Sequence, residues 1–381
     1  MTAAKLPAIG CEHPMAGIAR RTHARVPPYA FYEGRKQDWR FSMADEVTLV
    51  GQEAEGLAAR ACRGAGATEP TTRSLVAATM SAALFGPPTL GFPHLVDYLD
   101  SFRDGRISTN PQPKLNRPFA AFFVSDADRG IAQLGFDQAF DQFVETVRHF
   151  GVAIFTQTNS YTAGELGYFV RRLAAEGIVG LAATNANAMV VAKPGGPAVY
   201  STNPLAFGFP MGDGSPPMII DQASSATAFV NIVAAASEGR SIPAGWAVDA
   251  DGNDTEDPNL ALKGALLAFG GRKGANVALM VEMMSAGLSG GPWSLDTPDF
   301  RSGDVSPGVG MTVIAMMPGV DQAARIARAR TQADRLAGLG VFIPGVTGTS
   351  KKEQLTIPAG VHRRIAEFAA NAPAAGNMSL A

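Results

Sequence analysis

IPAGWAVDADGNDTEDPNLALKGALLAFGGRKG, residues 242–274, is the stretch of this sequence that decides the fold. Its spacing is P-x-G-W-x-x-D-x-D-G followed by G-A-L-L-x-F-G-G-x-K-G, and it leads into the strongly helical segment 275–288. Paired glycines therefore precede Arg272 and Lys273 at an expected helix N-terminus, where free backbone N–H groups attract phosphate oxygens. The alternative is a glycine-rich turn whose two basic side chains are simply solvated.

Strands and helices alternate on both sides of this stretch, and helices are concentrated toward the two ends of the chain. Toward the N-terminus we expect three helices: at 42–66 with Ser42 as N-cap, from Pro70, and at 94–105. In the middle we expect a strand, turn and helix within 119–140, a strand at 151–158, a helix at 168–177, a strand at 178–184, and a strand at 217–221 that runs directly into a helix at 223–239. Toward the C-terminus we expect a strand at 311–317 and a helix at 321–340. This order predicts an α/β (α+β) architecture.

The composition is that of an ordinary globular enzyme. The chain has 381 residues, of which 46% are apolar and 17% charged, and its 32 basic and 34 acidic side chains nearly cancel. We therefore expect no nucleic-acid and no membrane partner. Two cysteines, Cys11 and Cys62, are too few for a disulfide framework, and no apolar run has the length of a signal peptide or membrane span, so we expect a cytoplasmic protein.

Several familiar site motifs are absent from the sequence. No G-x-G-x-x-G follows a strand, and neither a phosphate-loop lysine motif nor a G-x-S-x-G motif occurs. The five histidines are scattered without the spacing of a metal site, so we expect no metal. The segment STNPLAFGFP (201–210) places Thr202 and Asn203 before Pro204 at a turn. The Asn203 amide suits a carboxamide such as that of nicotinamide, although a plain Asx-turn explains the same residues.

In order and spacing, these segments resemble the malate/L-lactate dehydrogenase-like family, which includes Δ1-pyrroline-2-carboxylate/Δ1-piperideine-2-carboxylate reductases. The resemblance covers roughly residues 42–345 and is most specific over 242–274. It implies a non-Rossmann fold, with a cofactor domain inserted in a mainly helical domain, and a homodimer whose active site lies near the subunit interface. It also implies NADP or NAD as cofactor, bound by Thr162, Ala163, Gly164, Asn185, Thr202, Asn203, Pro204, Asp221, Ala223, Ser224, Ser225, Lys273 and Gly345. We further expect Ser224 and Ser225 to open a helix after the strand that ends at Asp221.

The departures from the family pattern fall on the implied catalytic residues. The family's Ser-His-Gly, whose His is thought to donate a proton, falls on Thr89-Leu90-Gly91. A substrate-binding Arg falls on His94, and the Asn-His-Phe motif falls on Tyr161-Thr162-Ala163, so a second His is lost. A position that is Asp in the cyclic-imine reductases is Asn231. The candidate catalytic residues are therefore Thr89, Leu90, His94, Tyr161 and Asn231.

Leucine cannot donate a proton, so a ketone at Leu90 would lack general-acid help. An imine can arrive already protonated and then needs mainly a hydride. We therefore expect an NAD(P)H-dependent reductase of a small 2-imino acid, with His94 holding the substrate carboxylate when protonated. The alternatives are a 2-hydroxyacid dehydrogenase of the malate, lactate or ureidoglycolate type, in which Tyr161, His94 or water donates, and a degenerate homologue that binds a nucleotide without turnover.

The expected domains are an arm at 1–40, a helical domain at 41–115 completed by 301–381, and an NAD(P)-binding domain at 116–300. The arm carries the apolar anchors Tyr29, Phe31, Tyr32 and Trp39, which we expect to add contacts in the homodimer.

Overall fold

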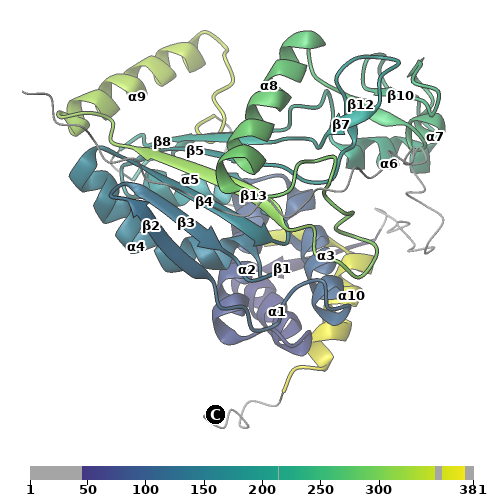
Figure 1. Cartoon of the computed structure of the whole chain (residues 1–381), viewed down its shortest axis with the longest axis horizontal. Coiled ribbons are helices and arrows are strands. Elements are labelled where there is room, and N and C mark those ends of the chain that lie inside the picture. The colour runs from purple at the N-terminus through teal and green to yellow at the C-terminus, as the bar shows by residue number, and fades with distance from the viewer. Residues whose placement is uncertain (1–44, 213, 348–353, 374–381) are drawn as a thin grey trace, which may run out of the picture.

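The structure is a computed structural model that describes residues 45–212, 214–347 and 354–373. Its largest layer is a seven-stranded sheet in the order β2-β3-β4-β13-β5-β8-β9 (Figure 1). The strands are β2 (Lys114–Phe119), β3 (Phe122–Asp126), β4 (Val152–Ser160), β13 (Val309–Met316), β5 (Val179–Thr184), β8 (Leu205–Phe209) and β9 (Met218–Gln222). Only β3 and β4 are parallel, and every other pair is antiparallel. The expectation of an α/β fold without a Rossmann-type parallel sheet is confirmed.

Two amphipathic helices, α4 (Ala132–Phe150) and α5 (Gly167–Ala175), pack on this sheet. On α4, Phe136, Phe140 and Phe143 recur at the spacing of one helical face and are buried. Phe136 meets Phe155 of β4 and Phe169 of α5 edge-on, with ring centroids 5.5 and 5.1 Å apart. These aromatic contacts fix the helices against the sheet whose end carries the candidate site.

A helical cluster lies below the sheet in Figure 1. It contains α1 (Gly51–Gly64), α2 (Glu69–Phe85), the short 3₁₀ turn η1 (Pro88–Leu90), α3 (Phe92–Arg103) and α10 (Ala359–Ala370). Helices α1 and α10 cross so closely that a Cβ added to Gly64 would lie 1.8 Å from the Phe368 carbonyl oxygen. Any larger residue at position 64 would therefore push the two helices apart.

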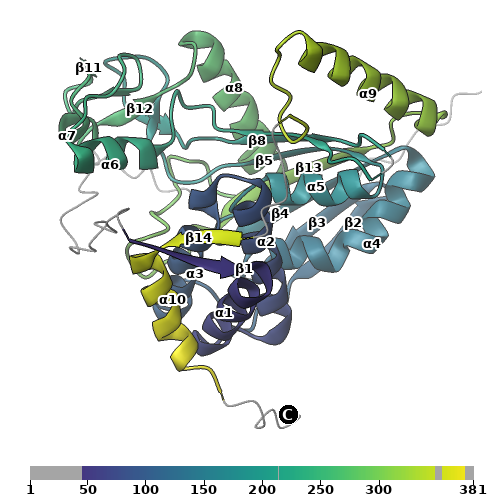
Figure 2. The same ribbon diagram turned by 180° about the vertical axis from the view of Figure 1, so that it is seen from behind.

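The start of the first predicted helix is wrong. Residues Glu46–Val50 form strand β1, which pairs antiparallel with β14 (Gln354–Pro358), and α1 begins only at Gly51. Figure 2 shows the two strands side by side although they come from opposite ends of the chain. The alternating pattern of EVTLV is satisfied by this distant partner, whose Leu355 and Ile357 are buried. Ser42, the predicted N-cap, and the predicted arm at 1–40 lie outside the described residues.

A smaller five-stranded sheet has the order β11-β10-β12-β6-β7 and lies at the upper right in Figure 1. Its strands are β11 (Asp254–Thr255), β10 (Ala247–Val248), β12 (Ala265–Leu267), β6 (Val190–Val191) and β7 (Ala198–Tyr200), and it is accompanied by α6 (Phe229–Glu238) and α7 (Pro258–Ala261). The deciding stretch 242–274 thus forms one edge of this sheet and then enters α8 (Arg272–Glu282), which continues as a π-helical turn, η2 (Met283–Gly287).

The expectation that Ser224 and Ser225 open a helix is wrong. Helix α6 begins at Phe229, because Ser225 is bridge-paired with Ala268 and the Phe269 N–H donates to the Ser224 carbonyl oxygen. These bonds hold residues 224–226 beside the end of β12. The serines therefore lie in a loop between the two sheets.

The segment 301–381 contributes to more than the helical cluster. Strand β13 lies in the middle of the large sheet, between β4 and β5, and α9 (Gln322–Gly338) follows it. Of the described elements in this segment, β14 and α10 join the cluster around α1. The sheet thus takes one of its central strands from beyond residue 300. Within the described ranges, no helix has the length and apolar character needed to cross a bilayer.

Candidate active site

One end of the seven-stranded sheet collects most of the residues expected to bind a dinucleotide. Strands β4, β5 and β9 end there, and strands β13 and β8 begin there. The strand register shows this, since Ser160 pairs with Val309 and Leu205 pairs with Gln222. The expected residues at this end are Thr162, Ala163, Gly164, Asn185, Thr202, Asn203, Pro204, Asp221, Ala223, Ser224 and Ser225. Strand ends from distant parts of the sequence are therefore the scaffold of the site.

Asn203 lies at the centre of a buried polar group at this end. Its side-chain amide donates to the Ala278 carbonyl oxygen and to Glu282 Oε2, both at 2.8 Å. Glu282 also accepts from the backbone N–H and hydroxyl of Ser294, at 2.6 and 2.7 Å. Both amide protons of Asn203 are thus engaged within the protein, and only Oδ1, buried and without a hydrogen-bond partner in the structure, is left for a donor. The expectation that Asn203 offers both donors and an acceptor to a carboxamide is corrected to an acceptor alone.

The loop 224–226 connects this polar group to the start of α8. Ser224 Oγ donates to the Asn203 carbonyl oxygen at 2.7 Å, and the Ser224 N–H donates to the Thr202 carbonyl oxygen at 2.7 Å. On its other side, the Ala226 N–H donates to the Leu267 carbonyl oxygen at 2.7 Å. The segments 202–203, 224–226 and 267–269 therefore form one continuous wall.

The start of α8 is open at the end of this wall. Gly270 and Gly271 have φ values of +57° and +62°, and no atom lies within 4 Å of a Cβ built on either residue. The N-cap Gly271 supplies no side-chain hydrogen bond, and Arg272 and Lys273 are exposed. The first N–H groups of α8 therefore lie at an open turn, next to two exposed basic residues.

Asp221, the penultimate residue of β9, lies beside the first turn of α5. Its Oδ2 accepts a 2.7 Å hydrogen bond from the Gly167 N–H. Burial raises the pKa of Asp221 to about 6, the Gly167 bond opposes this rise, and the neighbouring Glu165 carboxylate adds to it. Glu165 is paired in turn with Arg171 at 2.8 Å. Asp221 therefore changes its charge at a mildly acidic pH.

His94 and Thr162 join the helical cluster to the sheet end. His94 lies in the first turn of α3, and its Nε2 is 3.2 Å from Thr162 Oγ1, in the loop after β4. Its Nδ1 is 2.8 Å from Asp97 Oδ2. Thr162 Oγ1 donates to the Tyr98 hydroxyl at 2.9 Å. His94 is 8% exposed, so it belongs to a buried polar cluster and is not a surface-helix histidine.

Tyr161 lies in the same cluster but is fully enclosed. Its hydroxyl donates to the Phe300 carbonyl oxygen at 2.9 Å and accepts from Ser101 Oγ at 2.9 Å. Burial and the nearby Asp97 carboxylate raise the pKa of Tyr161 well above its usual value. These features favour a role in holding the cluster together over a role in delivering protons.

The remaining candidate residues are more dispersed. Leu90 is half-buried on η1, next to the exposed Thr89, as expected for a turn after the second helix. Asn231 lies in the first turn of α6, beside the small sheet, and its amide donates to Thr227 Oγ1 at 3.0 Å. A Cβ added to Gly345 would lie 2.4 Å from the Pro217 carbonyl oxygen, which places Gly345 at the opposite end of β9 from Asp221.

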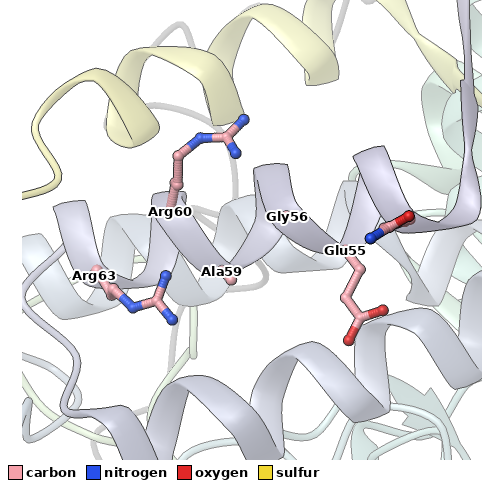
Figure 3. Close-up of a pocket in the computed structure, with 6 residues that line it drawn as sticks. Glu55, Gly56, Ala59, Arg60 and Arg63 are labelled. Carbon is pink, nitrogen blue, oxygen red and sulfur yellow. The ribbon is translucent and has the colours of Figure 1, made fainter. Parts of the chain in front are cut away.

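A pocket of about 410 Å³ lies apart from these residues, on an outer face of α1 (Figure 3). Gln52, Glu55, Gly56, Ala59, Arg60 and Arg63 line it, all from that one helix. It brings together none of the candidate residues. Among the described residues, no three His, Cys, Asp or Glu side chains converge as metal ligands.

Residues 51–354 match the family described as malate/L-lactate dehydrogenase. The chain belongs to this family. Among its relatives, the Δ1-pyrroline-2-carboxylate reductase 2 of Burkholderia multivorans is 32% identical over 79% of this chain and 89% of its own length. The (2R)-3-sulfolactate dehydrogenase (NADP(+)) of Chromohalobacter salexigens is 31% identical over 70% of this chain and 80% of its own.

Solved structures of the family share the fold. The Δ1-piperideine-2-carboxylate reductase of Pseudomonas syringae pv. tomato superposes with a TM-score of 0.77 at 31% identity, covering 84% of this chain and 99% of that one. A dehydrogenase from Sinorhizobium meliloti gives a TM-score of 0.75 at 26% identity, covering 86% and 99%. The resemblance inferred from residues 242–274 is confirmed, and with it the oxidoreductase class and the use of a nicotinamide cofactor.

Sequence reasoning missed three polar residues of the site. Asp97 follows His94 by one helical turn, and this i, i+3 spacing on an expected helix was a usable signal. Tyr98, the next residue, gave no separate signal. Glu282 lies 79 residues from Asn203 within an apolar helical segment, so nothing local pointed to their contact.

Proposed function

We propose that the chain is an NAD(P)H-dependent reductase that converts a small 2-imino acid, cyclic or N-alkylated, to the amino acid. The observation that carries the proposal is its similarity to the Burkholderia reductase over most of both chains. The half-buried Leu90 stands where the family pattern has a His and cannot donate a proton, so a proton that the substrate needs must come from another group.

The sheet end fits a nicotinamide dinucleotide. The open start of α8, with Arg272 and Lys273, suits the phosphates. The buried Oδ1 of Asn203 lacks a donor, which a carboxamide N–H of the ligand would supply. When bound, a reduced nicotinamide supplies a hydride. We assign NADP(H) in preference to NAD(H), because two cations face the phosphate region and one relative's name specifies NADP(+).

The substrate lies, in this proposal, between the loop 162–164 and the first turn of α3. A cation close to the first turn of α3 is Arg301, whose Nε is 3.5 Å from Asp97 Oδ1 and whose side chain is 30% exposed. We assign it to the substrate carboxylate. Arg301 keeps its charge at every relevant pH and its side chain is partly exposed, whereas His94 is 8% exposed, so we assign the carboxylate to Arg301 in place of the His94 expected from the sequence.

A 2-hydroxyacid dehydrogenase is the second candidate, and the sulfolactate dehydrogenase among the relatives favours it. A degenerate, non-catalytic homologue is the third. Titration with NADPH and NADH, followed by turnover of pyrroline-2-carboxylate, piperideine-2-carboxylate, pyruvate with methylamine, and oxaloacetate, separates the three. Imine turnover supports the proposal. Turnover of keto acids alone supports the second candidate, and cofactor binding without any turnover supports the third.

We also propose a cytoplasmic homodimer. The buried Cys62 is a free thiol, which suits a reducing compartment. Apolar side chains are exposed along α8 and the segment after it: Met280, Met283, Leu288, Trp293 and Leu295, at 41–65%. Such a face is typical of a protein–protein interface. Light scattering should give twice the chain mass, and a monomer at micromolar concentration would contradict the assembly.

A further inference from the structure

His94 occupies the position between the candidate cofactor loop and the helical cluster. A Cβ built on Gly164 would lie 4.0 Å from His94 Cδ2, so the imidazole lies directly against the loop 162–164. The ring is held edge-to-face by Tyr98, with centroids 4.9 Å apart. Its orientation is therefore fixed before any ligand binds.

The Asp97 carboxylate determines which ring nitrogen carries a proton. Burial alone would raise the pKa of Asp97. The nearby Arg301 and the hydrogen bond from His94 lower it by more, so the pKa of Asp97 lies below its usual value. An ionised Asp97 can only accept, and the 2.8 Å contact therefore places a proton on His94 Nδ1. The exchangeable position of the imidazole is Nε2, on the side of Thr162.

The hydroxyl groups beyond Nε2 accommodate both charge states of the ring. When Nε2 is protonated, it donates to Thr162 Oγ1. The Thr162 hydroxyl then donates to the Tyr98 hydroxyl, and the Tyr98 hydroxyl donates to the Thr162 carbonyl oxygen at 2.9 Å. When Nε2 is unprotonated, Thr162 Oγ1 donates to it, and the Tyr98 hydroxyl keeps the carbonyl as its acceptor. Rotation of hydroxyl groups alone interconverts the two arrangements, so neither charge state leaves a buried donor without an acceptor.

The charged and titratable groups around His94 come from three elements. Asp97 and Tyr98 lie on α3, Tyr161 precedes Thr162 in the loop after β4, and Arg301 approaches Asp97 from the segment after Phe300. The buried Arg106 acts on Asp97 from farther away. Asp97 is the one carboxylate in direct contact with the ring among these groups, so the pair behaves as an oriented acid–base unit.

We propose that His94 is the acid–base residue of this active site, with Asp97 as its positioning residue. The proposal rests on the proposed reductase function. A bound reduced nicotinamide would supply the hydride for the new C–H bond at C2, and the π pair of the C=N or C=O bond would move to nitrogen or oxygen. That nitrogen, or the oxygen of a keto acid, takes the proton from His94 Nε2. Nδ1–H stays with Asp97, and the neutral imidazole regains its proton from water.

Two kinds of substrate test this assignment. A neutral cyclic imine or a keto acid needs a proton as well as a hydride, whereas an N-methyl cyclic iminium carboxylate needs the hydride alone. His94→Gln should lower kcat for the first kind by about 10²- to 10⁴-fold, the usual worth of general acid–base catalysis. It should leave kcat for the N-methyl iminium nearly unchanged. Equal losses on both substrates would show a structural role and overturn the proposal.

Asp97→Asn provides the second test, with a readout besides activity. ¹⁵N NMR of the five histidines should show one ring with its proton on Nδ1, absent in His94→Gln and shifted toward the other tautomer in Asp97→Asn. The alkaline limb of the pH–rate profile, where the proton donor is lost, should move in Asp97→Asn, and imidazole should restore part of the activity of His94→Ala. A wild-type ring protonated on Nε2 alone would contradict the assignment.

Exposed residues of α4 supply matched controls, His149→Gln and Asp141→Asn, which should leave kcat and the pH profile unchanged. Failure of the underlying function is distinguishable, because wild-type enzyme would then reduce keto acids alone or none of the substrates, and in either case not the N-methyl iminium.

Discussion

Asn203 and Glu282 are 79 residues apart in the sequence and share a 2.8 Å hydrogen bond in the interior of the molecule. Asn203 is 0% exposed and has a φ of +36°, in the left-handed region. The bond ties the loop before β8 to the end of α8, and it positions the buried Oδ1 that we assign to the cofactor carboxamide.

Replacing Asn203 tests this connection. Asn203→Gly keeps the left-handed backbone accessible but removes a donor from the buried Glu282, and it should lower the free energy of unfolding by about 1–3 kcal/mol. Asn203→Ala should cost more, because alanine also resists a positive φ. Urea unfolding without ligand measures both values. If Asn203→Gly is as stable as the wild type, the Asn203–Glu282 bond contributes no net stability.

Asp221 should make the free energy of unfolding decrease as the pH rises. Its folded pKa of about 6 lies above the ordinary value of 3.8, so its contribution is fully present below about pH 4 and is lost as the pH rises through about 6. Allowing for partial exposure, we expect Asp221→Asn to be roughly 1–2 kcal/mol more stable than the wild type at pH 7 and about equal at pH 4. The side-chain oxygen of asparagine still accepts from Gly167. A stability difference that does not change between these pH values would contradict the burial argument.

The sequence predicts the local elements well where the contacts that hold them are local. A helix within 42–66, the strand at 151–158 and the start of α8 follow from periodicity and from glycine positions, and all three are present, although the helix covers only 51–64. Strand β1 was missed, because its pairing depends on 354–358, more than 300 residues away. A short alternating segment next to a strong helix has no local feature that separates it from that helix.

For the candidate site, too, the sequence predicts the residues that belong to local motifs but not the side-chain contacts between distant segments. The family motifs point to Thr162 and Asn185, which lie in loops, and to Asp221 near the end of β9, and the strand register explains why these residues meet at one sheet end. The roles of Asn203 and His94 were incompletely predicted, because their partners, Glu282 and Asp97, appear only when side chains are packed.

The start of α8 should contribute to cofactor affinity through charge. Lys273→Ala should weaken NADPH binding by roughly tenfold at low salt, and less at high salt, because the interaction with phosphate is screened. Fluorescence titration measures both affinities. The exposed Lys263, in the turn after α7, supplies the control Lys263→Ala, which should bind NADPH as the wild type does. Equal affinities for the wild type and Lys273→Ala would place the phosphates elsewhere.

Leu90 should influence the choice between imines and ketones. Leu90→His adds a possible donor on η1, four residues before His94, and should raise kcat/KM for keto acids relative to imines. Thr89→His, at the exposed neighbouring position, is the control and should leave the ratio unchanged. Steady-state kinetics with pyruvate and pyrroline-2-carboxylate give the ratio. A ratio that shifts equally in both variants would remove any special role for position 90.

The most direct test of the proposed function is the ratio of kcat/KM for Δ1-pyrroline-2-carboxylate to kcat/KM for oxaloacetate and for pyruvate, measured on the wild-type enzyme with saturating NADPH. We predict that the imine is reduced faster than either keto acid. If a keto acid is reduced faster than every imine offered, or if NADPH binds and none of the substrates is reduced, the assignment of this site to imine reduction is wrong.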